Sequence, residues 1–172
     1  MKAATEATPD NYALAYAQRR TWVLGSWSYG AILAASGTAY VLASAITGND
    51  PETGVFMTVL GGAIAGLGWF ASAPKRFSRK IPKPSMDVWR AEQAIRINKP
   101  AAIASNVLMA AILLAATFLA PRGMAADVIP ITAMLSVWTP LVGALMLRAT
   151  KLLVERGAIY DRWLQSREPG NS

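Results

Sequence analysis

The chain has 172 residues, of which 53% are hydrophobic and only 16% are charged, and its formal net charge is +7. This apolar share exceeds that of ordinary soluble domains, whereas the length is that of a single domain. Cysteine and histidine are both absent, which excludes disulfides, thiolate or imidazole metal ligands and thiol nucleophiles. We therefore expect a membrane protein that carries no cofactor.

Four long stretches of the chain contain no Asp, Glu, Lys or Arg. They are residues 21–49, 53–74, 100–121 and 128–147. A helix needs roughly 20 residues to cross a hydrocarbon core of about 30 Å, and its backbone groups must be bonded within the segment. The sequence therefore predicts an all-α, polytopic membrane protein with four transmembrane helices. The predicted spans are 22–46, 54–73, 101–120 and 128–147. A soluble helical bundle is the alternative, but it would require polar helix faces that these stretches lack.

The first helix is expected to begin well ahead of its span. Thr8 offers a cap, Pro9 suits the first turn, and the charge of Asp10 complements the helix dipole. The pair Arg19 and Arg20, followed by an apolar run and small residues, also has the parts of a twin-arginine export signal. We favour a retained span, because the run is longer than an ordinary signal and three further apolar stretches follow.

Small residues mark the predicted contact faces of the first two spans. Lipid gives helices no hydrophobic reason to associate, so close backbone contact holds them together. Gly30, Ala34 and Gly37 form such a stripe on the first span, and Gly62 and Gly66 form a G-x-x-x-G pair on the second. We expect these residues to pack the protein's own bundle rather than a separate partner.

Residues 74–100 form a basic segment between the second and third apolar stretches. Five of its cations fall within nine residues: Lys75, Arg76, Arg79, Lys80 and Lys83. This is more than membrane orientation needs, so the segment is expected to contact anionic lipid or an acidic protein. A nucleic-acid role is disfavoured because no aromatic residues are interleaved in a recognised binding motif. Ser85 and Asp87 are expected at the start of the third helix.

The fourth span contains two prolines and continues into an amphipathic tail, residues 148–172. Pro130 and Pro140 each remove a backbone donor, which predicts a kink or local irregularity. In the tail, Leu152, Ile159 and Trp163 recur at i, i+7 and i+11, which predicts a continuation of the fourth helix. Its apolar face is expected either to lie on an anionic leaflet or to dock on a partner.

The distribution of the cations predicts the topology. Of the 17 Lys and Arg residues, all except Arg122 lie in the N-terminal tail, the basic segment or the C-terminal tail. The positive-inside rule then places both termini and the basic segment in the cytoplasm, with the spans arranged as two helical hairpins in the inner membrane of a bacterial cell. The two hairpins resemble a tandem duplication, although their residue identity is too low to establish one.

The functional expectation follows from what the spans lack. They contain no ionisable side chain, which argues against proton relays and ion-coupled transport. No P-loop, G-x-G-x-x-G or metal-spaced cluster occurs, so we expect no enzyme. The sequence favours a non-catalytic protein that assembles, anchors or regulates a larger membrane complex, with protein partners or further copies and anionic lipids as its contacts. A small oligomeric channel, holin or transporter is the alternative.

Overall fold

The computed structural model describes residues 8–72, 82–83, 88–119 and 125–167, and in these ranges the chain forms helices and no strands. The helices are α1 (Pro9–Thr47), α2 (Glu52–Ala71), α4 (Val88–Leu119), α5 (Ala125–Val154) and α6 (Arg156–Gln165). The all-α prediction is therefore confirmed for the described part of the chain.

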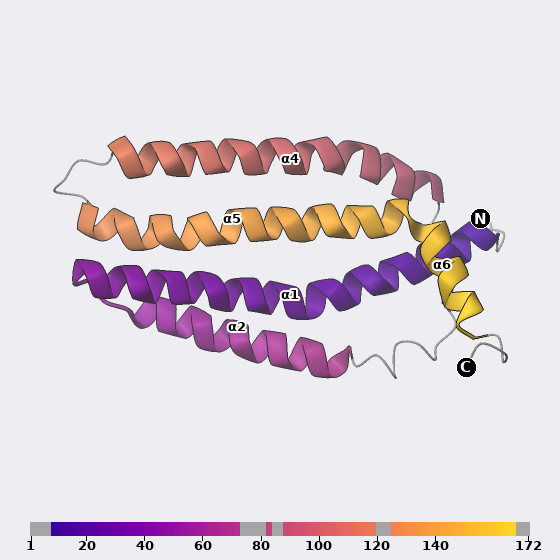
Figure 1. Cartoon of the computed structure of the whole chain (residues 1–172), viewed down its shortest axis with the longest axis horizontal. Helices are drawn as coiled ribbons and strands as arrows, with labels where there is room; N and C mark the ends of the chain where they lie inside the picture. Colours follow the sequence, from indigo (N-terminus) through magenta and orange to yellow (C-terminus); the bar gives the residue numbers. More distant parts are fainter. Residues whose placement is uncertain (1–7, 73–81, 84–87, 120–124, 168–172) are drawn as a thin grey trace, which may run out of the picture.

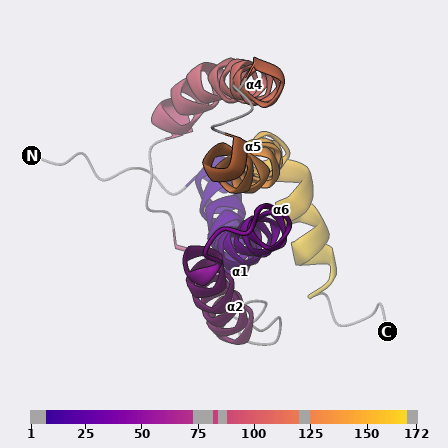
Figure 2. The same cartoon turned by 90° about the vertical axis from the view of Figure 1, so that its left-hand side faces the viewer.

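The four long helices lie side by side in the order α4, α5, α1, α2, as the two views in Figures 1 and 2 show. α1 packs against both α2 and α5, whereas α4 packs mainly against α5. The outer helices α2 and α4 therefore each have one main neighbour, and large apolar side chains remain exposed along them. Phe56 of α2 is 66% exposed and Leu108 of α4 is 63% exposed. Such surfaces suit a lipid environment.

Three helices are long and apolar enough to cross a membrane: α1, α2 and the part of α5 from Val128 to Val154. The described apolar part of α4, Lys99–Ala115, is shorter. The predicted third span, 101–120, runs past the side chains that the structure describes. Three candidate spans are therefore established, and the predicted third span, 101–120, stays a prediction.

α1 begins where the sequence predicts. The Thr8 hydroxyl accepts a hydrogen bond of 3.4 Å from the Asn11 amide, Pro9 occupies the first turn, and Asp10 lies beside the helix N-terminus. The helix ends at Gly48, whose φ of 74° is left-handed and therefore favours glycine. At 1.5 Å per residue its 39 residues extend about 58 Å, so the first turns lie beyond a hydrocarbon core of about 30 Å.

Glycines spaced seven residues apart bring the backbones of α1 and α2 together. A Cβ placed on Gly61 would lie only 2.7 Å from the Gly30 carbonyl oxygen, and one on Gly37 would lie 2.7 Å from the Gly54 carbonyl oxygen. Gly68 meets the backbone of Ser26 in the same way. The order of these contacts shows that the helices are antiparallel. A repeat of seven keeps one face toward the partner when two helices coil around each other.

Only some of the small residues predicted for helix packing lie in this contact. Gly30, Ala34 and Gly37 lie in it, but a Cβ on Gly62 or Gly66 would meet nothing within 4 Å. Gly62 and Gly66 therefore take no part in packing α2 against the described chain, contrary to our expectation. The reason is the register: the contact face follows Gly61 at intervals of seven, and each next residue turns about 100° away from it.

Prolines lie inside two of the helices without ending them. α5 runs through both Pro130 and Pro140, and α4 runs through Pro100. Pro130 is fully buried. The helical path of α5 is continuous at both positions, and the kink expected there stays a prediction.

The fourth helix continues into the tail only as far as Val154, so the prediction of a continuation is confirmed for residues 148–154 and wrong beyond them. α5 ends at Val154, Glu155 has φ −88° and ψ 17°, and α6 begins at Arg156. α6 then crosses α1 at the end of the bundle where α1 begins (Figure 1). This change of direction brings Ile159 and Trp163 onto Tyr16 of α1, a contact that the local sequence pattern cannot contain.

Candidate functional site at the charged end of the bundle

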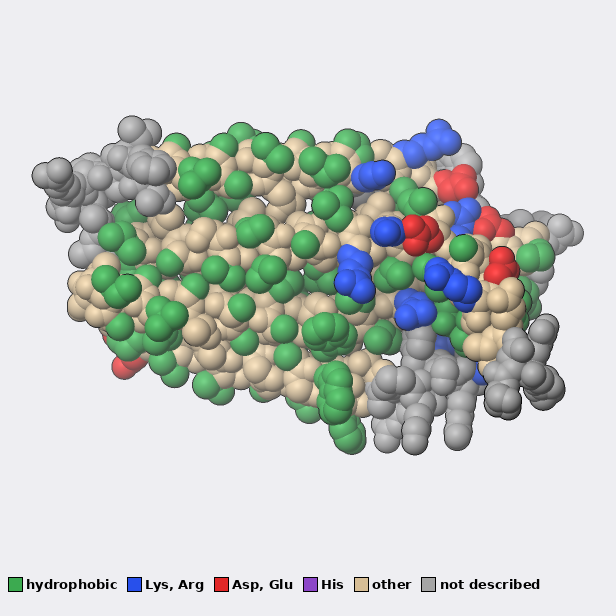
Figure 3. Space-filling view, viewed as in Figure 1, with side chains coloured by type: hydrophobic (Ala, Val, Ile, Leu, Met, Phe, Trp, Pro, Cys, Tyr) green, Lys and Arg blue, Asp and Glu red, His purple; other side chains and the backbone are tan. Residues whose placement is uncertain are grey.

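The described Lys and Arg side chains gather at one end of the bundle, which we call the charged end (Figure 3). The start of α1, the start of α4, the end of α5 and all of α6 meet there (Figure 1). Because neighbouring long helices run in opposite directions, cations that flank different apolar stretches arrive at the same level. The turn between α1 and α2, at the other end, carries Asp50 and Glu52.

An ion-pair network of Arg156, Asp10 and Glu92 joins three helices at the charged end. Nε of Arg156 donates to Oδ1 of Asp10 at 2.7 Å, and one terminal nitrogen donates to Oδ2 at 2.9 Å. The same nitrogen donates to Oε1 of Glu92 at 2.9 Å, and the other donates to the Leu153 carbonyl at 3.3 Å. The Arg156 side chain is only 14% exposed. The planar guanidinium thus links α6 to α1 through a two-point contact, and also to α4.

The charges of Asp10 and Arg156 are fixed rather than poised for proton transfer. The hydrogen bond from Arg156 lowers the pKa of Asp10 below its ordinary value, although partial burial opposes the shift. The hydrogen bond to Asp10 likewise raises the pKa of Arg156, again against burial. Both groups lie ahead of or beyond the predicted spans. Each is fully charged at neutral pH, so the network is suited to holding helices together.

An aromatic cluster lies beside the network and consists of Tyr16, Leu152, Ile159, Tyr160 and Trp163. The ring centroids of Tyr16 and Trp163 are 5.1 Å apart, and Tyr160 stacks on Trp163 at 5.5 Å. The tail residues expected to share one face do share this cluster. However, α1 covers that face and buries Ile159 and Trp163. Contrary to our expectation, these two residues are therefore not exposed to a leaflet or a partner.

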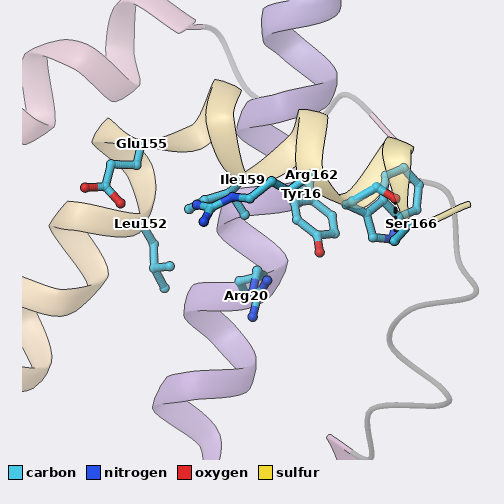
Figure 4. A pocket seen from close by; sticks show the side chains of 8 residues that line it. Tyr16, Arg20, Leu152, Glu155, Ile159, Arg162 and Ser166 are labelled. Atoms are coloured by element: carbon cyan, nitrogen blue, oxygen red, sulfur yellow. Dashed lines mark hydrogen bonds between the residues drawn. The ribbon is translucent and has the colours of Figure 1, made fainter. Parts of the chain in front are cut away.

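Two grooves open beside the cluster, and Arg20 of α1 lines both. The first has a volume of about 440 Å³ and also contains Arg162 and Glu155 (Figure 4). The second, of about 260 Å³, lies between α1, the end of α2 and the end of α5, and contains Arg148 and Trp27. Figure 4 shows Arg20 projecting from α1 below the crossing of α6. The charged end therefore offers concave cationic surfaces to an anionic group.

Of the five basic residues singled out in the sequence, the structure describes only Lys83. Lys83 is exposed, and Lys75, Arg76, Arg79 and Lys80 lie outside the described residues. Sequence reasoning missed the Arg156 network and the pairing of Arg20 with Arg148 across a groove. The only available signal for the groove was that Arg20 and Arg148 each directly border an apolar stretch.

Several polar groups within the apolar region bond to their own helices, whereas the buried hydroxyls of Ser36 and Ser44 in α1 have no hydrogen-bond partner in the described part of the chain. Asn106 donates to the Ala102 carbonyl at 2.6 Å, Thr58 to the Gly54 carbonyl at 2.8 Å, and Thr132 to the Val128 carbonyl at 2.8 Å. Asn106 also packs directly against Gly143 of α5. In the described part of the chain, no group of three or more His, Cys, Asp or Glu residues is placed to hold a metal. Binding of anions at the charged end is the chemistry that the described side chains favour.

No family model matches the sequence, and comparison with curated proteins and with solved structures gives no match. The geometry of the charged end and the open row of helices are therefore the features that bear on function.

Proposed function

We propose that the chain crosses a bacterial inner membrane four times, with both termini and the basic segment in the cytoplasm. α1 with α2, and α4 with α5, would form the two hairpins. Support comes from the gathering of the described cations at one end and from the antiparallel packing within each pair. The exposed apolar side chains of the outer helices would then contact lipid.

Reporter fusions test this topology. Alkaline phosphatase, which is active only outside the cytoplasm, should be active after Asp50 or Ala125 and inactive after Lys83 or Arg167, because the cations hold the basic end inside. Enzyme activity of each fusion, corrected for its amount in the membrane fraction, is the measurement. An active fusion after Lys83 would rule out the orientation, and an inactive fusion after Ala125 would rule out a crossing by the predicted third span, 101–120.

We further propose that the protein is non-catalytic and that it assembles, anchors or regulates a larger membrane complex. The observation that carries this proposal is the Arg156 network, which fixes α1, α4 and α6 together beneath an otherwise open row of helices. The network holds together the end at which the described cations gather, and a fixed basic surface suits recognition of a partner. Thr58 and Asn106 bond to their own helices, which argues against a pathway lined by them through one chain. The basic segment would extend this surface.

Mild-detergent purification followed by mass spectrometry tests the complex. Wild type should co-purify with other membrane proteins, and changing Arg79, Lys80 and Lys83 to Gln should release them, increasingly at higher salt, because exposed charge contacts are screened. A control variant should remove three exposed cations elsewhere and retain the partners. It changes Lys151, Arg162 and Arg167 to Gln, three exposed cations of the C-terminal tail. Equal loss in both variants would show that only total charge matters, which contradicts a contact by this segment.

A homo-oligomeric channel is the second candidate, and the exposed Gly62 and Gly66 favour it. Their side of α2 has no contact with the described chain and is free for a second copy. If the purified wild type contains only copies of itself and conducts ions or solutes in liposomes, and the Arg79, Lys80 and Lys83 variant behaves identically, the channel replaces the complex subunit.

A further inference from the structure

We propose that the groove between Arg20 and Arg148 binds the headgroup phosphate of an anionic phospholipid from the cytoplasmic leaflet. The proposal deepens the proposed function and rests on its membrane orientation. It assigns lipid recognition to two residues of the helical bundle, at a distance in sequence from the basic segment.

The two arginines lie at the boundary between the polar and apolar parts of the chain. Arg20 is the last charged residue before the apolar stretch of α1, and Arg148 is the first after that of α5. α1 and α5 pack against each other, and both arginines line the same groove of about 260 Å³. Ser72, just beyond the end of α2, borders it as well. In a bilayer this level is that of the lipid headgroups.

The charge in the groove lacks a counterion among the described residues. In the described part of the chain, neither Arg20 nor Arg148 has a carboxylate within ion-pair distance, since the ion pairs there join Arg156 to Asp10 and Glu92 and Lys151 to Glu155. The Ser72 hydroxyl is engaged by the Trp69 carbonyl at 3.1 Å. The Arg20 guanidinium lies 5.9 Å from the Tyr16 ring centroid. Arg20 and Arg148 are thus the two cations that line the groove, and the planar geometry of a guanidinium suits the oxygens of a phosphate.

The rest of the groove favours a lipid over a free anion. Leu24, Trp27 and Leu152 supply an apolar wall next to the two cations. Tryptophan is enriched where bilayer meets water, and the apolar wall would contact the glycerol and first acyl carbons. The volume of 260 Å³ is slightly below the roughly 300–1,000 Å³ of pockets that enclose a whole small molecule. It therefore suits one portion of a lipid whose chains lie along the outside of the bundle.

Lipid binding by the full-length protein, delipidated in a neutral detergent, tests the site. Native mass spectrometry would measure retention of phosphatidylglycerol and of zwitterionic phosphatidylcholine. Wild type should prefer phosphatidylglycerol by tenfold or more. Each cation near an anionic headgroup contributes about a fivefold gain, so changing both Arg20 and Arg148 to Gln should weaken phosphatidylglycerol binding about 25-fold and leave phosphatidylcholine unaffected.

A control variant of equal charge should retain the preference. It changes Lys151 and Arg167 to Gln, two exposed cations outside the basic segment that do not line the groove. Equal loss in both variants, or none in the Arg20 and Arg148 variant, overturns the proposal. Displacement of the lipid by millimolar inorganic phosphate also overturns it, since the site would then bind a free anion. Both ends of the protein are accessible in detergent, so lipid binding can be measured even if the proposed topology or partner binding is wrong. The two proposals can therefore fail separately.

Discussion

Replacing Gly61 by alanine should separate α1 from α2. A Cβ on Gly61 would lie 2.7 Å from the Gly30 carbonyl oxygen and 2.9 Å from the Ala34 Cα, so both obstacles are backbone atoms that no rotamer change can move. Overpacking by a methyl group typically costs about 1–3 kcal/mol, and a rigid backbone neighbour places this change at the upper end. The midpoint of unfolding during titration with sodium dodecyl sulfate, followed by circular dichroism, should fall clearly.

The adjacent Gly62 provides the matched control. Gly62→Ala makes the same chemical change one position along the same helix, but nothing lies within 4 Å of the new methyl group. Its midpoint should equal that of wild type or rise slightly, because alanine favours helix over glycine. If Gly61→Ala is as stable as Gly62→Ala, α1 and α2 do not pack through the glycines spaced at seven. If Gly62→Ala instead lowers the association of copies, the homo-oligomer gains support.

Local signals in the sequence predicted where helices form. Uncharged stretches and a capping residue act within one segment, so the start of α1 at Thr8 and the end of α2 near Ala71 could be read directly. Choosing the contact face of α2 required its register against α1. The G-x-x-x-G pair at Gly62 is a common packing motif, but Gly54, Gly61 and Gly68 show a longer repeat that identifies the true face.

The charged end could not be predicted because its contacts join distant parts of the chain. Arg156 and Asp10 are separated by 146 positions, and no periodicity relates them. The break at Glu155 has the same origin. Its neighbours are compatible with a continuous helix, and the packing of Trp163 on Tyr16 requires a new direction. Tertiary contact therefore overrides local helix propensity at this position.

Replacing Trp163 by alanine should release α6 from α1. Trp163 is 8% exposed, lies 5.1 Å from the Tyr16 ring, and has the Arg167 guanidinium 4.2 Å from its own ring centroid. Truncating a well-packed tryptophan costs about 3–5 kcal/mol. α6 has only 10 residues, and isolated helices shorter than about 12–15 residues are marginal in water. Loss of this contact should therefore unfold α6 locally and leave the long helices intact.

Amide hydrogen exchange in detergent would detect the release. In Trp163→Ala, protection across residues 156–165 should fall to that of an unstructured peptide, and protection of α1 beyond Arg20 should stay unchanged. Trp22→Ala is the control, because Trp22 is 80% exposed and its removal should leave α6 protected. Full protection of α6 in Trp163→Ala would mean that Arg156 alone holds it through Asp10 and Glu92. Combining the change with Arg156→Gln would then expose the helix, and the aromatic cluster would not be what keeps α6 on α1.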